Sequence, residues 1–121
     1  MNKSMSNIDT ILNEYGEFIS IPTELLVNPR YNKTGESGRL RHNSVILYGV
    51  LLYLSEKQKN KDEDGRAYVT ITGDKIADIV GTTTGSVPTN MLKQLEEFNL
   101  IERGPIQVGK PNKIYIKSIS R

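Results

Sequence analysis

The fold is decided by residues 82–121, which read TTTGSVPTNMLKQLEEFNLIERGPIQVGKPNKIYIKSISR. Within this stretch, Leu92, Leu95 and Phe98 recur every third residue with polar and charged residues between them, which predicts an amphipathic helix. A strand over residues 100–103 follows directly, and the alternation in residues 113–117 places Ile114 and Ile116 on one face of a second strand. Glycine and proline in residues 104–112 suit the tip between the two strands. A long helix followed by such a hairpin is the second half of a winged helix.

A shorter helix precedes this one and completes a helix-turn-helix. Residues 74–80 form its pattern, which Thr72 can cap and Gly81 can end, and an alternating strand over residues 66–71 comes before it. The last helix is expected to start at Ser86 or Val87, because Pro88 is tolerated only in a first helical turn. The predicted fold class is therefore α+β: a winged helix made of a helix-turn-helix and a two-stranded wing.

The first half of the chain supplies the remaining elements. Residues 43–54 are apolar most of the way around a helix, which predicts a centrally buried helix. Residues 28–38 are predicted to be a loop, and residues 18–22 alternate and end at Pro22, which predicts a short N-terminal strand. We expect two parts, an N-terminal arm over residues 1–17 and a winged-helix domain over residues 18–121.

The composition is that of one compact domain. The chain has 121 residues, of which 36% are hydrophobic and 25% are charged. Its longest apolar run, residues 45–54, is much shorter than the roughly 20 residues that cross a bilayer, and residues 1–9 lack the apolar region of a secretory signal. There is no cysteine, which excludes disulfides and thiolate metal sites. A cytoplasmic protein is expected.

Positive charge is concentrated in two parts of the chain. Residues 100–121 carry five basic residues against one acidic residue, and residues 28–42 carry four against one, although the net charge of the whole chain is only +2. Basic patches attract phosphate, so the distribution favours nucleic acid as a partner. The alternative interpretation is a solvated basic edge that prevents pairing between sheets.

The candidate DNA-binding residues follow from the predicted fold. Hydroxyls at the start of the last helix can meet backbone phosphate, asparagine can read adenine, and lysine can read guanine or hold phosphate. The residues on the helix are Thr83, Thr84, Ser86, Asn90 and Lys93, and those on the wing are Arg103, Lys110 and Lys113. The wing also has a purely structural interpretation, since Gly109, Lys110 and Asn112 are typical of a hairpin turn.

Enzymatic chemistry is not predicted. The carboxylates of residues 62–64 lie in a lysine-compensated polar segment, and the segment fails the pattern of a calcium-binding loop at Arg66, Ala67 and Gly73. Residues 104–110 have the spacing of a phosphate-binding loop, but Pro111 replaces the magnesium-binding hydroxyl and a strand follows. His42 is the only histidine, and a loop or helix-start role is expected for it. We expect neither a cofactor nor a metal.

The chain resembles the RepA N-terminal domain family of plasmid replication initiators from Gram-positive bacteria. The resemblance rests on five segments in order: 18–22 with Leu25, 44–52, 64–69, 92–103 and 109–116. It implies a winged-helix domain that acts as a homodimer on double-stranded DNA, at repeated sequences of a replication origin carried by a plasmid or another mobile element.

Two departures from that family keep other functions open. The start of the last helix holds Gly85 and Pro88 where the family usually has polar and basic residues, and the family places a primase-recruiting domain after this one. The chain is therefore either an excised domain or a protein with this module alone. The alternatives to replication initiation are a protein-interaction module that binds a host or element protein, and a transcriptional regulator.

Overall fold

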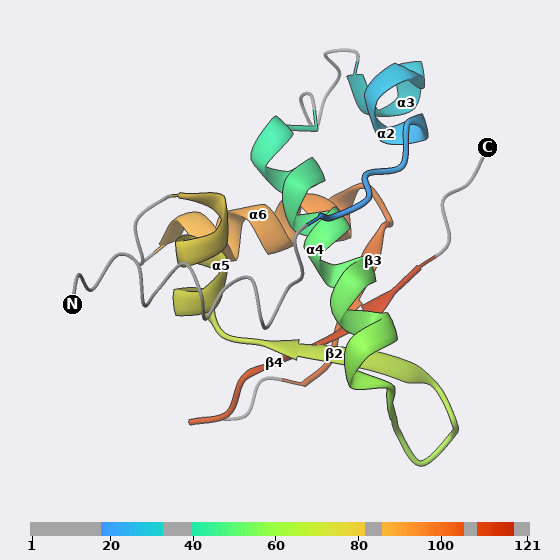
Figure 1. The fold of residues 1–121 in the computed structure, drawn as a ribbon, viewed down its shortest axis with the longest axis vertical. Coiled ribbons are helices and arrows are strands. Elements are labelled where there is room, and N and C mark those ends of the chain that lie inside the picture. The colour runs from blue at the N-terminus through green and yellow to red at the C-terminus, as the bar shows by residue number, and fades with distance from the viewer. Residues whose placement is uncertain (1–17, 33–39, 82–85, 106–108, 118–121) are drawn as a thin grey trace.

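The computed structural model describes residues 18–32, 40–81, 86–105 and 109–117 (Figure 1). In chain order the elements are α2 (Glu24–Val27), α3 (Pro29–Asn32), α4 (His42–Gln58), β1 (Asn60–Lys61), β2 (Ala67–Ile71), α5 (Gly73–Val80), α6 (Ser86–Glu97), β3 (Ile101–Arg103) and β4 (Asn112–Ile116). None of the helices in these ranges is long and apolar enough to cross a membrane. The predicted arm over residues 1–17 lies outside the described residues.

Helix α4 is the centre of the core, as the apolar pattern predicts. It packs against α5, α6 and the sheet, and Leu47, Val50 and Leu51 are completely buried. In Figure 1 it runs down the middle of the molecule, with α5 on one side, α6 crossing behind it and the sheet toward its lower end. The helix ends at Lys59, which adopts a left-handed conformation (φ 53°) and whose N–H donates to the Ser55 carbonyl.

The helix-turn-helix forms between α5 and α6. Thr72 Oγ1 accepts a hydrogen bond from the Lys75 N–H, and Gly81 ends α5 at a φ of 68°. Helix α6 begins at Ser86, which confirms the predicted start, and Pro88 lies in its first turn, buried, with its Cβ 3.8 Å from where a Cβ on Gly73 would stand. Pro88 therefore contributes to the contact between the two helices.

The strands form one antiparallel sheet in the order β1-β2-β4-β3. Strand β4 pairs with β3 through Ile101 and Ile116, and with β2 through Val69 and Ile114. Val69 and Ile114 are completely buried, and they form the floor of the core beneath α4. With β3 and β4 as the wing, the predicted α+β winged helix is confirmed.

The predicted N-terminal strand is wrong. Residues 18–22 pair with no strand of the described sheet, and Ile19 and Ile21 instead pack against the core beside α4. The Ser20 carbonyl oxygen lies 3.0 Å from where a Cβ on Gly49 would stand, so the segment crosses α4 at its glycine. The alternating apolar residues that predicted a strand pack against a helix instead. Packing on a helix buries these side chains as well as pairing in a sheet would.

A short helix, α3, lies inside the segment predicted as a loop. It is held by Tyr31, which is 1% exposed and whose ring centroid lies 6.0 Å from that of Phe98. The Tyr31 carbonyl accepts a hydrogen bond from the Leu40 N–H, which fixes the chain just before α4 begins. Asn28 Oδ1 accepts from the Arg30 N–H and starts the turn.

Candidate nucleic-acid interface

One face of α6 is exposed along its whole described length. Thr89, Asn90, Lys93 and Glu97 are exposed, whereas Met91, Leu92 and Leu95 on the opposite face are buried. The spacing of three to four residues is one turn of a helix, so the exposed side chains form a single stripe. This stripe, residues 89, 90, 93 and 97, is called the α6 face below. Two of the predicted site residues, Asn90 and Lys93, lie on it together, and Thr89 was missed.

The predicted residues at the helix start fall mostly beyond the described chain. Thr83 and Thr84 lie outside the described residues, and Ser86 opens α6 with its side chain outside them. The structure therefore gives Ser86 a position at the helix N-terminus but gives no geometry for its hydroxyl.

The two wing lysines have different surroundings. Lys110 is exposed at the tip of the wing, next to Gly109, whose φ of 78° makes the turn. Lys113 is half-buried on β4, and its Nζ lies 4.4 Å from the centre of the Tyr68 ring on β2. The ammonium group of Lys113 therefore lies over the sheet, against an aromatic face that stabilises its charge.

Arg103 is occupied within the protein. Its Nε and Nη2 donate to Glu96 Oε1 at 3.2 and 3.1 Å, and its backbone N–H donates to Glu96 Oε2 at 3.2 Å. Both side chains are about one third exposed, at 31% and 39%. The pair ties the last turn of α6 to the first strand of the wing, so Arg103 positions these elements relative to each other.

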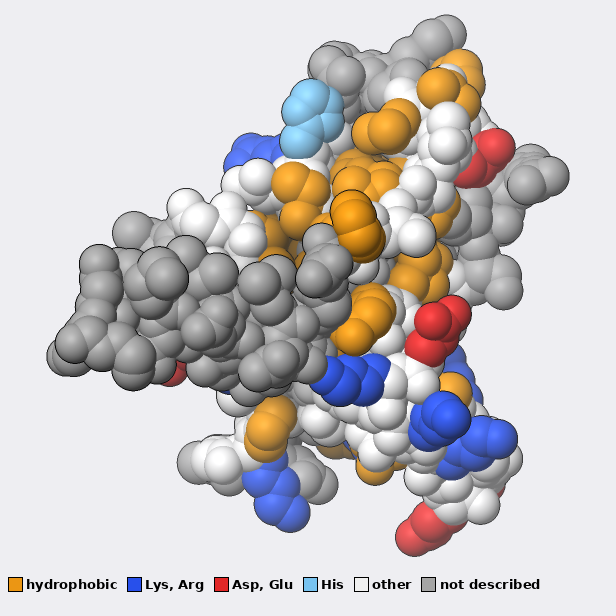
Figure 2. Space-filling model, in the orientation of Figure 1, with side chains coloured by type: hydrophobic (Ala, Val, Ile, Leu, Met, Phe, Trp, Pro, Cys, Tyr) orange, Lys and Arg blue, Asp and Glu red, His pale blue; other side chains and the backbone are white. Residues whose placement is uncertain are grey.

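A groove lies between α6 and the first turn of α4. It has a volume of about 540 Å³, and its walls are formed by Arg41, His42, Asn43 and Ser44 on one side and by Val87, Asn90, Met91, Lys93, Gln94 and Glu97 on the other. The Arg41 N–H donates to Gln94 Oε1 at 2.9 Å and joins the two walls. Figure 2 shows His42, the pale-blue side chain, exposed at the surface in the upper part of the view.

Sequence reasoning missed the α4 side of this groove. Arg41 and His42 are exposed and extend the basic surface beyond α6. A signal was present, because residues 28–42 carry an excess of positive charge and the first turn of α4 has no acidic residue. What the sequence could not indicate is that this loop ends beside α6.

The outer face of the sheet carries a paired cluster of charges. Arg66 donates to both carboxylate oxygens of Glu102 at 3.0 and 3.2 Å and lies 4.1 Å from the centre of the Tyr115 ring. The Asp62 carboxylate accepts hydrogen bonds from the Arg66 N–H and from the Tyr115 hydroxyl, and these bonds lower the pKa of Asp62. The charge of Arg66 on this face is thus compensated.

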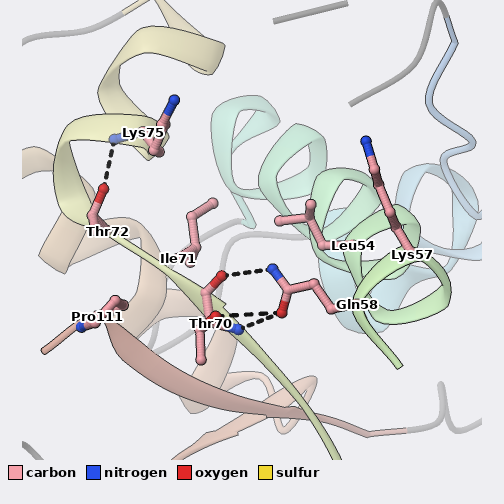
Figure 3. A pocket seen from close by; sticks show the side chains of 8 residues that line it. All are labelled: Leu54, Lys57, Gln58, Thr70, Ile71, Thr72, Lys75 and Pro111. Atoms are coloured by element: carbon pink, nitrogen blue, oxygen red, sulfur yellow. Dashed lines mark hydrogen bonds between the residues drawn. The ribbon is translucent and has the colours of Figure 1, made fainter. Parts of the chain in front are cut away.

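A second hollow, of about 300 Å³, lies between the end of α4, β2 and the start of α5 (Figure 3). Gln58 closes one side of it by donating to the Thr70 carbonyl and accepting from the Thr70 N–H, both at 2.9 Å. Leu54 and Ile71 give it an apolar floor, with Lys57 and Lys75 at its edge. In the described ranges no three metal-ligating side chains come together.

Several solved structures are similar to the chain. No curated protein matches the chain. Among solved structures, one named "Structure of Rep-DNA complex" shares 25% identity at a TM-score of 0.63, over 90% of this chain and 82% of that one. Another, named "N-Terminal domain of DNA binding protein", shares 27% identity at a TM-score of 0.60, over 88% and 78%. A third, "Structure of MDR initiator", has 23% identity and a TM-score of 0.57, over 90% and 83%, and shares the fold.

The family model described as "Replication initiator protein A (RepA) N-terminus" matches residues 17–121, which is most of the chain. The match includes every described helix and strand, from α2 to β4. This chain belongs to the family of replication initiator protein A N-termini.

Proposed function

We propose that this chain binds double-stranded DNA in replication initiation and reads its sequence through the α6 face. Family membership and the similarity to a solved Rep–DNA complex support a DNA-binding role in replication initiation. The observation that carries the proposal is the exposure of Asn90 and Lys93 on one stripe of the second helix of a helix-turn-helix. That helix enters the major groove in proteins of this architecture.

Two exposed side chains of the α6 face have a defined chemistry toward DNA. Asn90 carries an acceptor and two donors in one plane, which match the edge of adenine, and Lys93 can donate to guanine or to phosphate. Thr83, Thr84 and Ser86 precede them in the sequence and are assigned to backbone phosphates. Lys110 on the wing adds a further phosphate contact. Lys113 and Arg103 act as positioning residues, because Tyr68 and Glu96 hold their charged groups.

The biological setting is part of the same proposal. We assign the target to repeated sequences in the origin of a plasmid or other mobile element, bound by a homodimer in the cytoplasm, with a further replication protein as a later partner. The chain acts as a binding protein and not as an enzyme. This assignment is supported by the carboxylates of Glu96 and Glu102, which are engaged by arginines and are poorly suited to acid–base chemistry.

Titration of a labelled duplex with lysine variants tests the proposal. Lys93→Ala and Lys110→Ala should each weaken binding and lower the slope of log affinity against log salt by about 1, since each removes a cation that displaces counterions. Lys61→Ala is the matched control, because Lys61 is also exposed but lies on β1, in the hairpin after α4. Equal slopes for all four proteins would remove α6 and the wing from the interface.

A second candidate function, a protein-interaction module, is favoured by a different observation. Phe18, Leu26 and Val27 are exposed by 85%, 48% and 62%, and apolar side chains run along the middle of the face shown in Figure 2. A transcriptional regulator would use the same DNA surface as an initiator. Loss of DNA binding without loss of fold would favour the protein-interaction module.

A further inference from the structure

We propose that the N-terminus of α4 is a binding site for a backbone phosphate of the DNA, formed together with Ser44 in the groove beside α6. The inference rests on the proposed DNA-binding function and adds a site to it. The phosphate belongs to the stretch of duplex next to the part that contacts the α6 face. In Figure 1, α6 lies between the start of α4 above it and the tip of the wing below it. A duplex bound to α6 would thus contact the protein on both sides of that helix.

The first turn of α4 has the properties of an anion site. Arg41 occupies the N-cap position with an extended backbone and makes no side-chain cap, and the first turn contains no acidic residue. Among the residues that the structure describes, no acceptor faces the N–H groups of His42, Asn43 and Ser44. The helix is 17 residues long, so its dipole places about half a positive elementary charge at its N-terminus. Phosphate oxygens are suitable acceptors for such donors.

Ser44 gives an independent indication of a ligand. Its side chain is 1% exposed, it lines the groove, and among the residues that the structure describes its Oγ has no hydrogen-bond partner. Buried hydroxyls without a partner are rare, because removal from water is unfavourable when no hydrogen bond replaces it. The hydroxyl lies in the same helical turn as the uncapped N–H groups. A phosphate bound over this turn would supply an acceptor for the hydroxyl and for the N–H groups together.

The charges around the groove favour an anion. Arg41 and His42 lie at its α4 edge and Lys93 lies at its α6 edge, where Glu97 is the single acidic residue in the lining. Asn90 lies on the same wall, so the groove is continuous with the α6 face. A free phosphate has the same chemistry as a backbone phosphate. The position beside Asn90 and Lys93 is what favours the duplex as the source.

Four variants, two of them controls, separate the contributions. Ser44→Ala removes the hydroxyl and leaves the charge unchanged. His42→Pro removes one N–H at the first helical position, where proline fits and where the extended Arg41 before it is compatible. His42→Ala is its matched control, since it removes the imidazole but keeps the N–H. Ser55→Ala, on the half-buried Ser55 near the other end of α4, controls for the loss of a serine in this helix.

The test is anisotropy of labelled origin-derived and unrelated duplexes, with the full chain. Ser44→Ala should weaken binding to both by about five- to tenfold, and His42→Pro should bind about tenfold more weakly than His42→Ala. The salt slope of Ser44→Ala should equal that of the unchanged protein, because no cation is lost. Duplexes with a single neutral methylphosphonate at successive positions should show one position whose replacement weakens the unchanged protein but not Ser44→Ala.

The outcomes distinguish this site from the function on which it rests. If the unchanged protein binds DNA and Ser44→Ala and His42→Pro bind equally well, the phosphate site is refuted while the DNA-binding function stands. If the unchanged protein binds neither duplex, the DNA-binding function fails and the site fails with it. Titration with inorganic phosphate, followed by the amide signals of Asn43 and Ser44, covers the other source: saturation there without any effect on DNA would assign a free anion and overturn the proposal.

Discussion

Ser44 is the residue at which stability and the proposed binding oppose each other. Its hydroxyl is buried without a partner in the described structure, so the folded protein bears the desolvation of a polar group. Ser44→Ala should therefore raise the free energy of unfolding by about 1 kcal/mol, measured by urea denaturation, while it weakens DNA binding. A merely structural serine would not change the two quantities in opposite directions. A decrease in stability would show that the hydroxyl has a partner in solution.

Gly49 is required by the segment that crosses α4. A Cβ at this position would stand 3.0 Å from the Ser20 carbonyl oxygen and 3.3 Å from Ile21 Cγ1. Alanine favours a helix by up to about 1 kcal/mol relative to glycine, but displacing a packed backbone costs about 1–3 kcal/mol. We expect Gly49→Ala to lower the unfolding free energy by about 1 kcal/mol.

Gly73→Ala is the matched control for that substitution. Its Cβ would meet only Pro88 Cβ at 3.8 Å, an ordinary contact at the start of α5. This variant should be neutral or slightly more stable in the same denaturation experiment. Equal stability of the two variants would mean that residues 19–21 do not press on α4 in solution.

Among the elements, the hairpin of β1 and β2 depends on Asp62. The pKa of Asp62 is lowered, first by the hydrogen bond from the Arg66 N–H and next by the Tyr115 hydroxyl. Tyr115→Phe should raise this pKa part of the way to its ordinary value, because the Arg66 bond remains. Carbon-detected NMR titration of the carboxyl group measures it, and an unchanged pKa would exclude the Tyr115 bond.

The same group predicts a pH dependence of stability. Because the folded-state pKa is lowered, the stabilisation by Asp62 is present above its unfolded-state pKa and is lost as the pH falls through the folded value. Asp62→Asn should therefore lower the unfolding midpoint near neutrality, where the ionised carboxylate stabilises the fold, and flatten the decrease in the midpoint below about pH 4. A variant whose acid profile matches that of the unchanged protein would contradict this account.

The elements that sequence predicted best are those whose pattern has one interpretation. Leu92, Leu95 and Phe98 fixed the phase of α6, and that phase placed Asn90 and Lys93 together on its exposed face. Residues 18–22 failed because short alternating segments can pack on a helix as well as in a sheet. Burial of Tyr31 against Phe98, which holds α3, joins residues far apart in the chain and has no local signal.

The candidate site was predictable to a similar extent. Exposure of Lys110 follows from its position at a hairpin tip, whereas the surroundings of Lys113 and Arg103 depend on Tyr68 and Glu96 across the fold. The groove beside α4 could not be predicted, since it depends on where the loop before His42 returns to α6.

At the scale of the whole molecule, some basic side chains are paired with carboxylates, while others are exposed on α6 and on either side of it. Arg66 and Arg103 are paired with Glu102 and Glu96, so their charge is compensated within the fold. Among the described residues, exposed cations lie on α6 itself and on either side of it, namely Lys93 on the helix, Arg41 at the start of α4 and Lys110 on the wing. A duplex on α6 would meet positive charge on both sides, which accounts for binding by a chain whose net charge is only +2.

The measurement that tests the central claim most directly is the anisotropy of two kinds of labelled duplex, titrated at two salt concentrations. One comes from the replication origin that we propose as the target, and the other from unrelated sequence. The account predicts that the origin duplex binds at least about a hundredfold more tightly and that both affinities fall with salt. Equal affinity for the two duplexes, or no binding at low salt, would contradict it and would direct attention to a protein partner.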